Sequence, residues 1–75
     1  MRFIEMTGKQ LAQVVNDEEM REQDLINSGI TNDTIVRVNE HGDIEIRHEQ
    51  CWDVVGGLLG EYYERIKGIT GLDWV

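Results

Sequence analysis

Residues 34–48 read T-I-V-R-V-N-E-H-G-D-I-E-I-R-H, and this stretch decides the fold. Asn39 opens a type I turn and Gly42 stands where the chain must turn left-handed, a pattern typical of a three-residue hairpin loop with a glycine bulge. The stretch therefore predicts an antiparallel hairpin at about 34–48. With Asn39 facing Asp43, one face of this hairpin is wholly aliphatic and consists of Val36, Val38, Ile44 and Ile46.

The opposite face of the hairpin pairs Arg37 with Glu45 across the strands, a contact worth about 0.2–1 kcal/mol. A slip of one residue would turn the aliphatic face to water, so the register is strongly specified. Because two strands alone are only marginally stable, we expect another element to cover the aliphatic face.

The segments before the hairpin predict one strand and two short helices. Residues 2–6 are β-prone at their centre, and Thr7 with Gln10 forms a capping box that starts a first helix. A second helix is expected at about 17–28, with Gly29 in the left-handed position beyond its end.

The C-terminal half predicts a long helix at about 49–67, and Gly68 would cap its end. We expect the tail that follows to dock, since Leu72 and Trp74 are too apolar for a solvated terminus. The apolar residues of the helix recur at the spacing of an amphipathic stripe, and they are Trp52, Val55, Leu59, Tyr62, Tyr63 and Ile66.

These elements predict one α+β domain over residues 1–75, in the order β-α-α-β-β-α. In this small two-layer arrangement the hairpin and the N-terminal strand pack on the long C-terminal helix, and the place of the N-terminal strand in the sheet is left open. The single cysteine excludes an internal disulfide, so hydrophobic packing must supply the stability. Neither a membrane helix nor a signal peptide is recognisable, and we expect a cytoplasmic protein.

Fifteen acidic residues against seven Lys and Arg give a net charge of −8 at pH 7. The few basic residues are dispersed, which argues against binding to nucleic acid. The charge also opposes a winged-helix-like nucleic-acid-associated regulator, the alternative that two short helices followed by a hairpin would suggest. The acidity serves solubility, and it would attract a basic partner surface.

Glycines interrupt the predicted long helix, and each costs roughly 0.5–1 kcal/mol relative to Ala. Two of them would share one helix face, where they would allow close packing within the chain or against a second copy; a helix kink is the third interpretation. Surface Tyr and Trp are typical of interface hot spots. The candidate interface residues are therefore Gly56, Gly60, Tyr62, Tyr63 and Trp74.

No catalytic, cofactor-binding or metal-ligating motif is recognisable in the chain. The only soft metal ligands are His41, His48 and Cys51, whereas a structural zinc site needs about four ligands. Acid–base catalysis needs carboxyls in a cleft, for which so short a chain has little room. We therefore expect no enzyme activity, cofactor, metal or small-molecule substrate.

The sequence thus predicts a small acidic, non-enzymatic module for protein interaction or regulation. Its partner is another protein or a second copy in a homodimer. An acidic decoy or carrier protein is a further alternative, although residues 27–30, N-S-G-I, match the Asp-Ser-Leu motif of an acyl carrier poorly.

Overall fold

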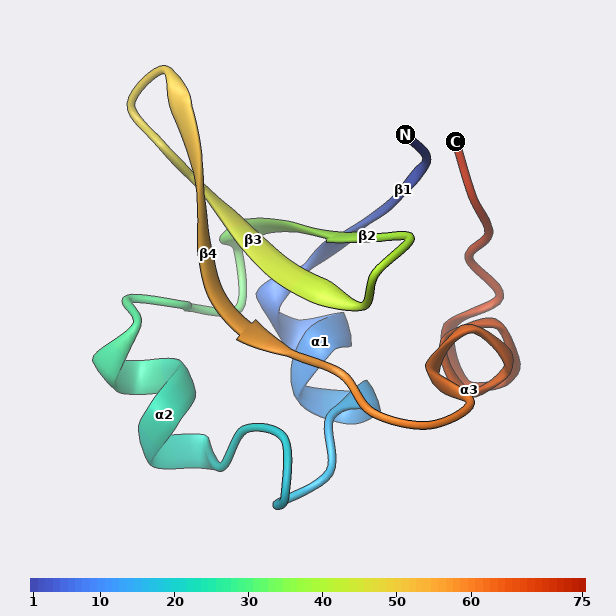
Figure 1. Cartoon of the computed structure of the whole chain (residues 1–75). Helices are drawn as coiled ribbons and strands as arrows, with labels where there is room; N and C mark the ends of the chain where they lie inside the picture. Colours follow the sequence, from blue (N-terminus) through green and yellow to red (C-terminus); the bar gives the residue numbers. More distant parts are fainter.

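A computed structural model describes all 75 residues, Met1–Val75. The elements in chain order are β1 (Phe3–Thr7), α1 (Gly8–Val14), α2 (Glu22–Asn27), β2 (Ile35–Asn39), β3 (Asp43–His48), β4 (Cys51–Gly57) and α3 (Tyr62–Thr70). The strands form one antiparallel sheet in the order β1-β2-β3-β4, and the helices pack beside it (Figure 1). The predicted α+β class is confirmed.

The hairpin of β2 and β3 has the predicted register. Gly42 has a φ of 84°, and its N–H donates to the carbonyl of Asn39 at 3.0 Å, as the glycine-bulge loop requires. β1 pairs with the outer side of β2, so the N-terminal strand lies at an edge of the sheet. The cross-strand pairs of the hairpin are Val36–Ile46, Arg37–Glu45 and Val38–Ile44.

The core lies between one face of the sheet and the helices. Val36, Val38 and Ile44 have no exposed surface, and Ile46 is partly buried against them, which confirms the predicted aliphatic face. Each helix contributes buried side chains to this cluster, and they are Leu11 and Val14 of α1, Leu25 of α2 and Ile66 of α3.

The predicted long helix at about 49–67 is wrong. Residues 51–57 instead form β4, which pairs with β3, and α3 begins only at Tyr62. Glu45 faces Val54 and Ile44 faces Gly56, so Val55 is the extra residue of a β-bulge. The bulge breaks the alternation of the strand, and its apolar residues consequently matched a helical spacing.

The ends of the helices were predicted more accurately than the long helix, because they depend on local sequence signals. The capping box is confirmed, because Gln10 N–H donates to Thr7 Oγ1 at 3.2 Å and Thr7 N–H donates to Gln10 Oε1 at 2.9 Å. Gly29 has the predicted left-handed φ, 78°, beyond α2. At the end of α3 the left-handed cap is Gly71, with a φ of 75°, rather than Gly68.

The second helix begins later than predicted, at Glu22. The carbonyl of Asn16 accepts hydrogen bonds from the N–H groups of Glu19 and Met20, at 2.9 and 3.0 Å. These bonds close a separate turn. The acidic residues that were expected in the first turn of the helix lie in this separate turn instead.

The C-terminal tail docks as predicted. Leu72 and Trp74 are partly buried against the core cluster, and Val75 N–H donates to the carbonyl of Phe3 at 2.8 Å. The tail therefore lies beside β1. None of the helices has the length and apolar character needed to cross a bilayer.

Candidate interaction surface

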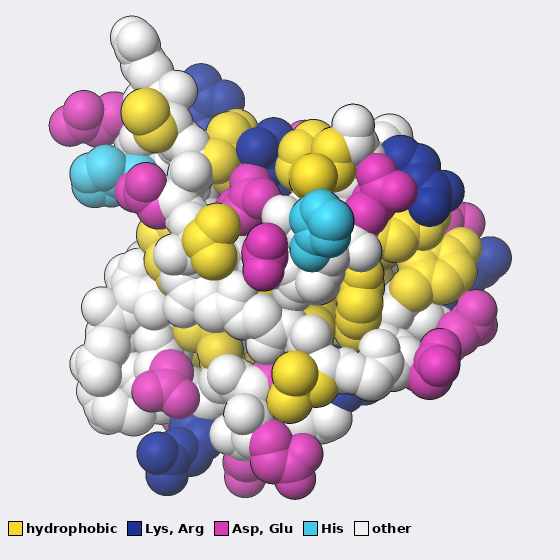
Figure 2. All heavy atoms as spheres, viewed as in Figure 1, with side chains coloured by type: hydrophobic (Ala, Val, Ile, Leu, Met, Phe, Trp, Pro, Cys, Tyr) yellow, Lys and Arg dark blue, Asp and Glu magenta, His cyan; other side chains and the backbone are white.

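One face of the sheet is turned away from the helices and has no element over it (Figure 1). We call it the open face. Side chains alternate between the two faces along each strand, and Figure 2 shows apolar, basic and acidic side chains interleaved in the upper part of the molecule. The open face carries Phe3 and Glu5 of β1, Ile35 and Arg37 of β2, Glu45 and Arg47 of β3, and Trp52 and Val54 of β4.

Arg37 lies between two aromatic rings at the centre of the open face. Its guanidinium carbon is 3.8 Å from the centroid of the Phe3 ring and 4.1 Å from that of the Trp52 ring. Such contacts are each worth about 0.5–2 kcal/mol, depending on how much water they exclude. We call this arrangement the Arg37 clamp. It draws one ring from β1 and the other from β4.

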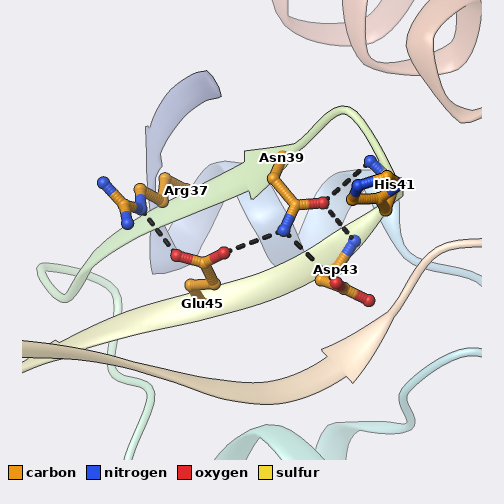
Figure 3. A network of polar contacts seen from close by, with 5 residues as sticks. All are labelled: Arg37, Asn39, His41, Asp43 and Glu45. Atoms are coloured by element: carbon orange, nitrogen blue, oxygen red, sulfur yellow. Dashed lines mark hydrogen bonds and ion pairs between the residues drawn. The ribbon is translucent and has the colours of Figure 1, made fainter. Parts of the chain in front are cut away.

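Glu45 lies beneath the clamp and is 7% exposed. Arg37 Nε donates to its Oε1 at 2.7 Å, and Asn39 Nδ2 donates to its Oε2 at 2.9 Å. The side-chain oxygen of Asn39 in turn accepts the backbone N–H groups of His41 and Asp43 (Figure 3). Asn39, which opens the hairpin loop, therefore also fixes the carboxylate that orients Arg37.

The open face offers an oriented cation beside exposed apolar groups. The two terminal nitrogens of Arg37 have no hydrogen-bond partner in the protein, and the side chain is 21% exposed. Val54 is 61% exposed and Ile35 is 50% exposed on the same face. A guanidinium held in one orientation suits a carboxylate ligand, because the ordering cost is already met by the fold.

The structure separates the two glycines of the predicted interface, which do not share a helix face. Gly56 lies in β4, where an added Cβ would come within 3.0 Å of Met20 Sδ in the core. Gly60 lies in the loop before α3 with a φ of 65°, and nothing is within 4 Å of an added Cβ. Packing within the chain explains Gly56, and a left-handed turn explains Gly60.

The aromatic members of the predicted interface contact the chain itself. Tyr62 Oη donates to the carbonyl of Glu40 at 2.7 Å. Tyr63 stacks on Trp74 with ring centroids 5.4 Å apart, and its hydroxyl donates to Asp73 at 2.8 Å. Hydrogen bonds from this hydroxyl and from the N–H of Trp74 lower the pKa of Asp73. The stack therefore anchors the tail.

A second ion pair joins the turn after α1 to helix α3. Glu19, whose side chain is 1% exposed, accepts from Arg65 Nη2 and from Leu59 N–H, both at 2.6 Å, and from Asn16 N–H at 2.8 Å. Burial alone would raise the pKa of Glu19, but these hydrogen bonds and the guanidinium outweigh it and lower the pKa. Its role is to hold three segments together.

The metal-ligand candidates lie at two separate hairpin ends. His48 and Cys51 face each other at the tip of the β3–β4 hairpin, and His41 lies in the β2–β3 loop. No three or more His, Cys, Asp or Glu side chains are grouped so as to hold a metal ion.

Sequence reasoning missed both rings of the Arg37 clamp. The sequence pattern predicts a strand at Phe3 without its position in the sheet, and it predicts a helix at Trp52. The β-prone alternation of Trp52 and Val54 is the signal that favours a strand. The loop at 49–50 hides it, because it reads Glu-Gln rather than the Asn-Gly typical of a two-residue hairpin. Glu49 nevertheless adopts a φ of 57° there.

Comparisons with known proteins assign no family to the chain. No protein-family model matches the sequence, and no curated protein or solved structure is significantly similar to it. A proposal for the function of this chain must therefore rest on the geometry of the open face.

Proposed function

We propose that this protein is a small acidic, non-enzymatic module of the cytoplasm that binds another protein across the open face of its sheet. The Arg37 clamp is the observation that supports the proposal. Two aromatic rings and a buried carboxylate orient one arginine at the surface, with free N–H donors and exposed Ile35 and Val54 nearby. Aromatic residues and Arg are the types most enriched at interface hot spots.

The chemistry of the open face supports one kind of partner. A carboxylate would accept hydrogen bonds from the terminal nitrogens of Arg37, and an apolar side chain beside it would cover Val54. A different protein fits this requirement better than a second copy does. A two-fold contact centred on Arg37 would bring two Arg37 cations together, and like charges in contact are unfavourable.

Replacing Val54 by Asp should abolish the interaction. Val54 is 61% exposed, so the variant should fold, but a partner that covers this position would then bury an unpaired charge. We expect recovery of the partner to fall about tenfold or more. The measurement is quantitative mass spectrometry of proteins that co-purify with the tagged protein from its native cytoplasm.

The matched control for this variant is Ile69→Asp on α3, where the exposed fraction is 50%. It introduces the same charge away from the open face and should leave the recovery unchanged. Recovery of the same proteins by wild type and Val54→Asp would contradict the proposal, as would equal losses with both variants.

Nucleic-acid binding distinguishes this proposal from the winged-helix-like alternative. With a net charge of −8, the protein should not bind duplex DNA at about 0.15 M salt. Fluorescence polarisation of a labelled duplex provides the measurement. Binding at micromolar concentration that weakens with added salt would contradict this expectation and favour a nucleic-acid-associated regulator.

A further inference from the structure

A hollow on the helical side of the molecule lies between α1, α2 and the turn that joins them. Its volume is about 340 Å³, within the range of sites that take small ligands or single large side chains. The hollow is distinct from the open face, since the buried side chains of α1 and α2 belong to the core cluster on the opposite side of the sheet. The lining consists of Ala12, Val15, Asp17, Met20, Glu22 and Leu25.

Four of the six lining residues are hydrophobic and form the floor of the hollow, whereas polar atoms supply the larger share of its exposed surface. Met20 and Leu25 are buried there, Val15 is partly buried, and the small side chain of Ala12 leaves space on α1. Met20 also lies against Gly56 of β4. An unbranched thioether can change rotamer to accommodate an apolar guest, a property that binding surfaces for varied peptides use.

The rim of the hollow carries carboxylates that the protein leaves free. Asp17 and Glu22 are exposed, and neither side chain has a hydrogen-bond or ion-pair partner in the chain. Arg21 is the one basic residue between positions 16 and 27. Four of the fifteen acidic side chains are paired with Arg or Lys, namely Glu19, Glu40, Glu45 and Asp73, and Asp17 and Glu22 belong to the larger group that is not.

We infer that this hollow binds a basic amphipathic segment of a partner protein. The segment inserts an apolar side chain between α1 and α2 and sets Lys or Arg against Asp17 and Glu22, in the manner of a helix in a groove. The net charge of −8 attracts such a segment over longer range. The two surfaces thus select opposite charges, because the open face takes a carboxylate.

The test uses a fluorescently labelled helical peptide with Leu at i, i+4 spacing and Lys at the flanking positions, and a matched peptide with Glu in place of Lys. We expect the Lys peptide to bind in fluorescence anisotropy and the Glu peptide not to bind. Combining Asp17→Asn with Glu22→Gln should weaken binding about fivefold. Ala12→Phe, which fills the hollow, should abolish it.

A control double variant, Glu49→Gln with Glu64→Gln, makes the same change in net charge at exposed positions away from the hollow. It should leave the affinity within about twofold. No binding of the Lys peptide, equal binding of both peptides or equal weakening by both double variants would overturn the inference. Val54→Asp should leave peptide binding unchanged, so failure of the open-face proposal is distinguishable from failure here.

Discussion

Replacing Gly8 by Ala should destabilise the protein by about 2–3 kcal/mol, although Ala is the better helix former. Gly8 begins α1 and donates its N–H to the carbonyl of Thr34 at 2.8 Å. A methyl group there would overlap the carbonyl oxygen of Thr31 and come within 2.8 Å of Ile30 Cγ2. The backbone of the turn before β2 would have to move, which would break the bonds that it makes to the helix.

Gly68→Ala is the matched control for this substitution. Gly68 lies within α3, and nothing is within 4 Å of an added Cβ. This variant should gain about 0.5–1 kcal/mol, because Ala restricts the unfolded chain and favours the helix. Urea unfolding of both variants measures whether each substitution lowers or raises the free energy of unfolding. Similar stabilities would show that the turn does not fit tightly against Gly8.

Replacing Glu19 by Ala should cost about 3 kcal/mol at neutral pH. The variant would leave the partly buried Arg65 and the N–H of Leu59 without their acceptor, and the Nε of Arg65 already has no partner. Glu19→Gln should cost somewhat less, because the amide keeps the volume and one accepting oxygen. Glu18→Ala, at the exposed neighbouring position, should change stability by less than about 0.5 kcal/mol.

The pH dependence of the Glu19 variants has a defined sign. The pKa of Glu19 is lower in the folded protein than its ordinary value of 4.5. Its ionised form therefore stabilises the fold above that value, and the contribution is lost as pH falls through the folded pKa. The stability difference between wild type and Glu19→Gln should narrow between neutral pH and about pH 3. A difference that stays constant would contradict an ionised Glu19.

Structural features that depend on residues close together in the chain, and that only one conformation satisfies, could be predicted from the sequence. The loop from Asn39 to Gly42 and the aliphatic alternation allowed one register, and the structure has it. The capping box of Thr7 had the same property, since its two hydrogen bonds involve residues close in the chain. Such signals depend on neighbours that the sequence itself supplies.

The pairing of β3 with β4, and with it the open face, could not be predicted in the same way. The identity of β4 depends on pairing with β3 and on the close approach of Met20 to Gly56, contacts between segments distant in the sequence. The bulge at Val55 also removed the alternation that marks a strand. With β4 taken for a helix, Trp52 could not be placed beside Arg37, and the clamp remained hidden.

The Arg37 clamp also affects the cooperativity of the sheet. β1 and β4 are opposite edge strands that share no backbone ladder. Phe3 and Trp52 nevertheless contact one guanidinium from β2, which is bonded to the carboxylate of Glu45 on β3. Fraying of either edge would remove a ring from the cation and admit water to the buried carboxylate, so the opening of each edge is energetically coupled to the other. The surface that we propose for binding therefore lies on four strands that these contacts link to one another, not on a loop.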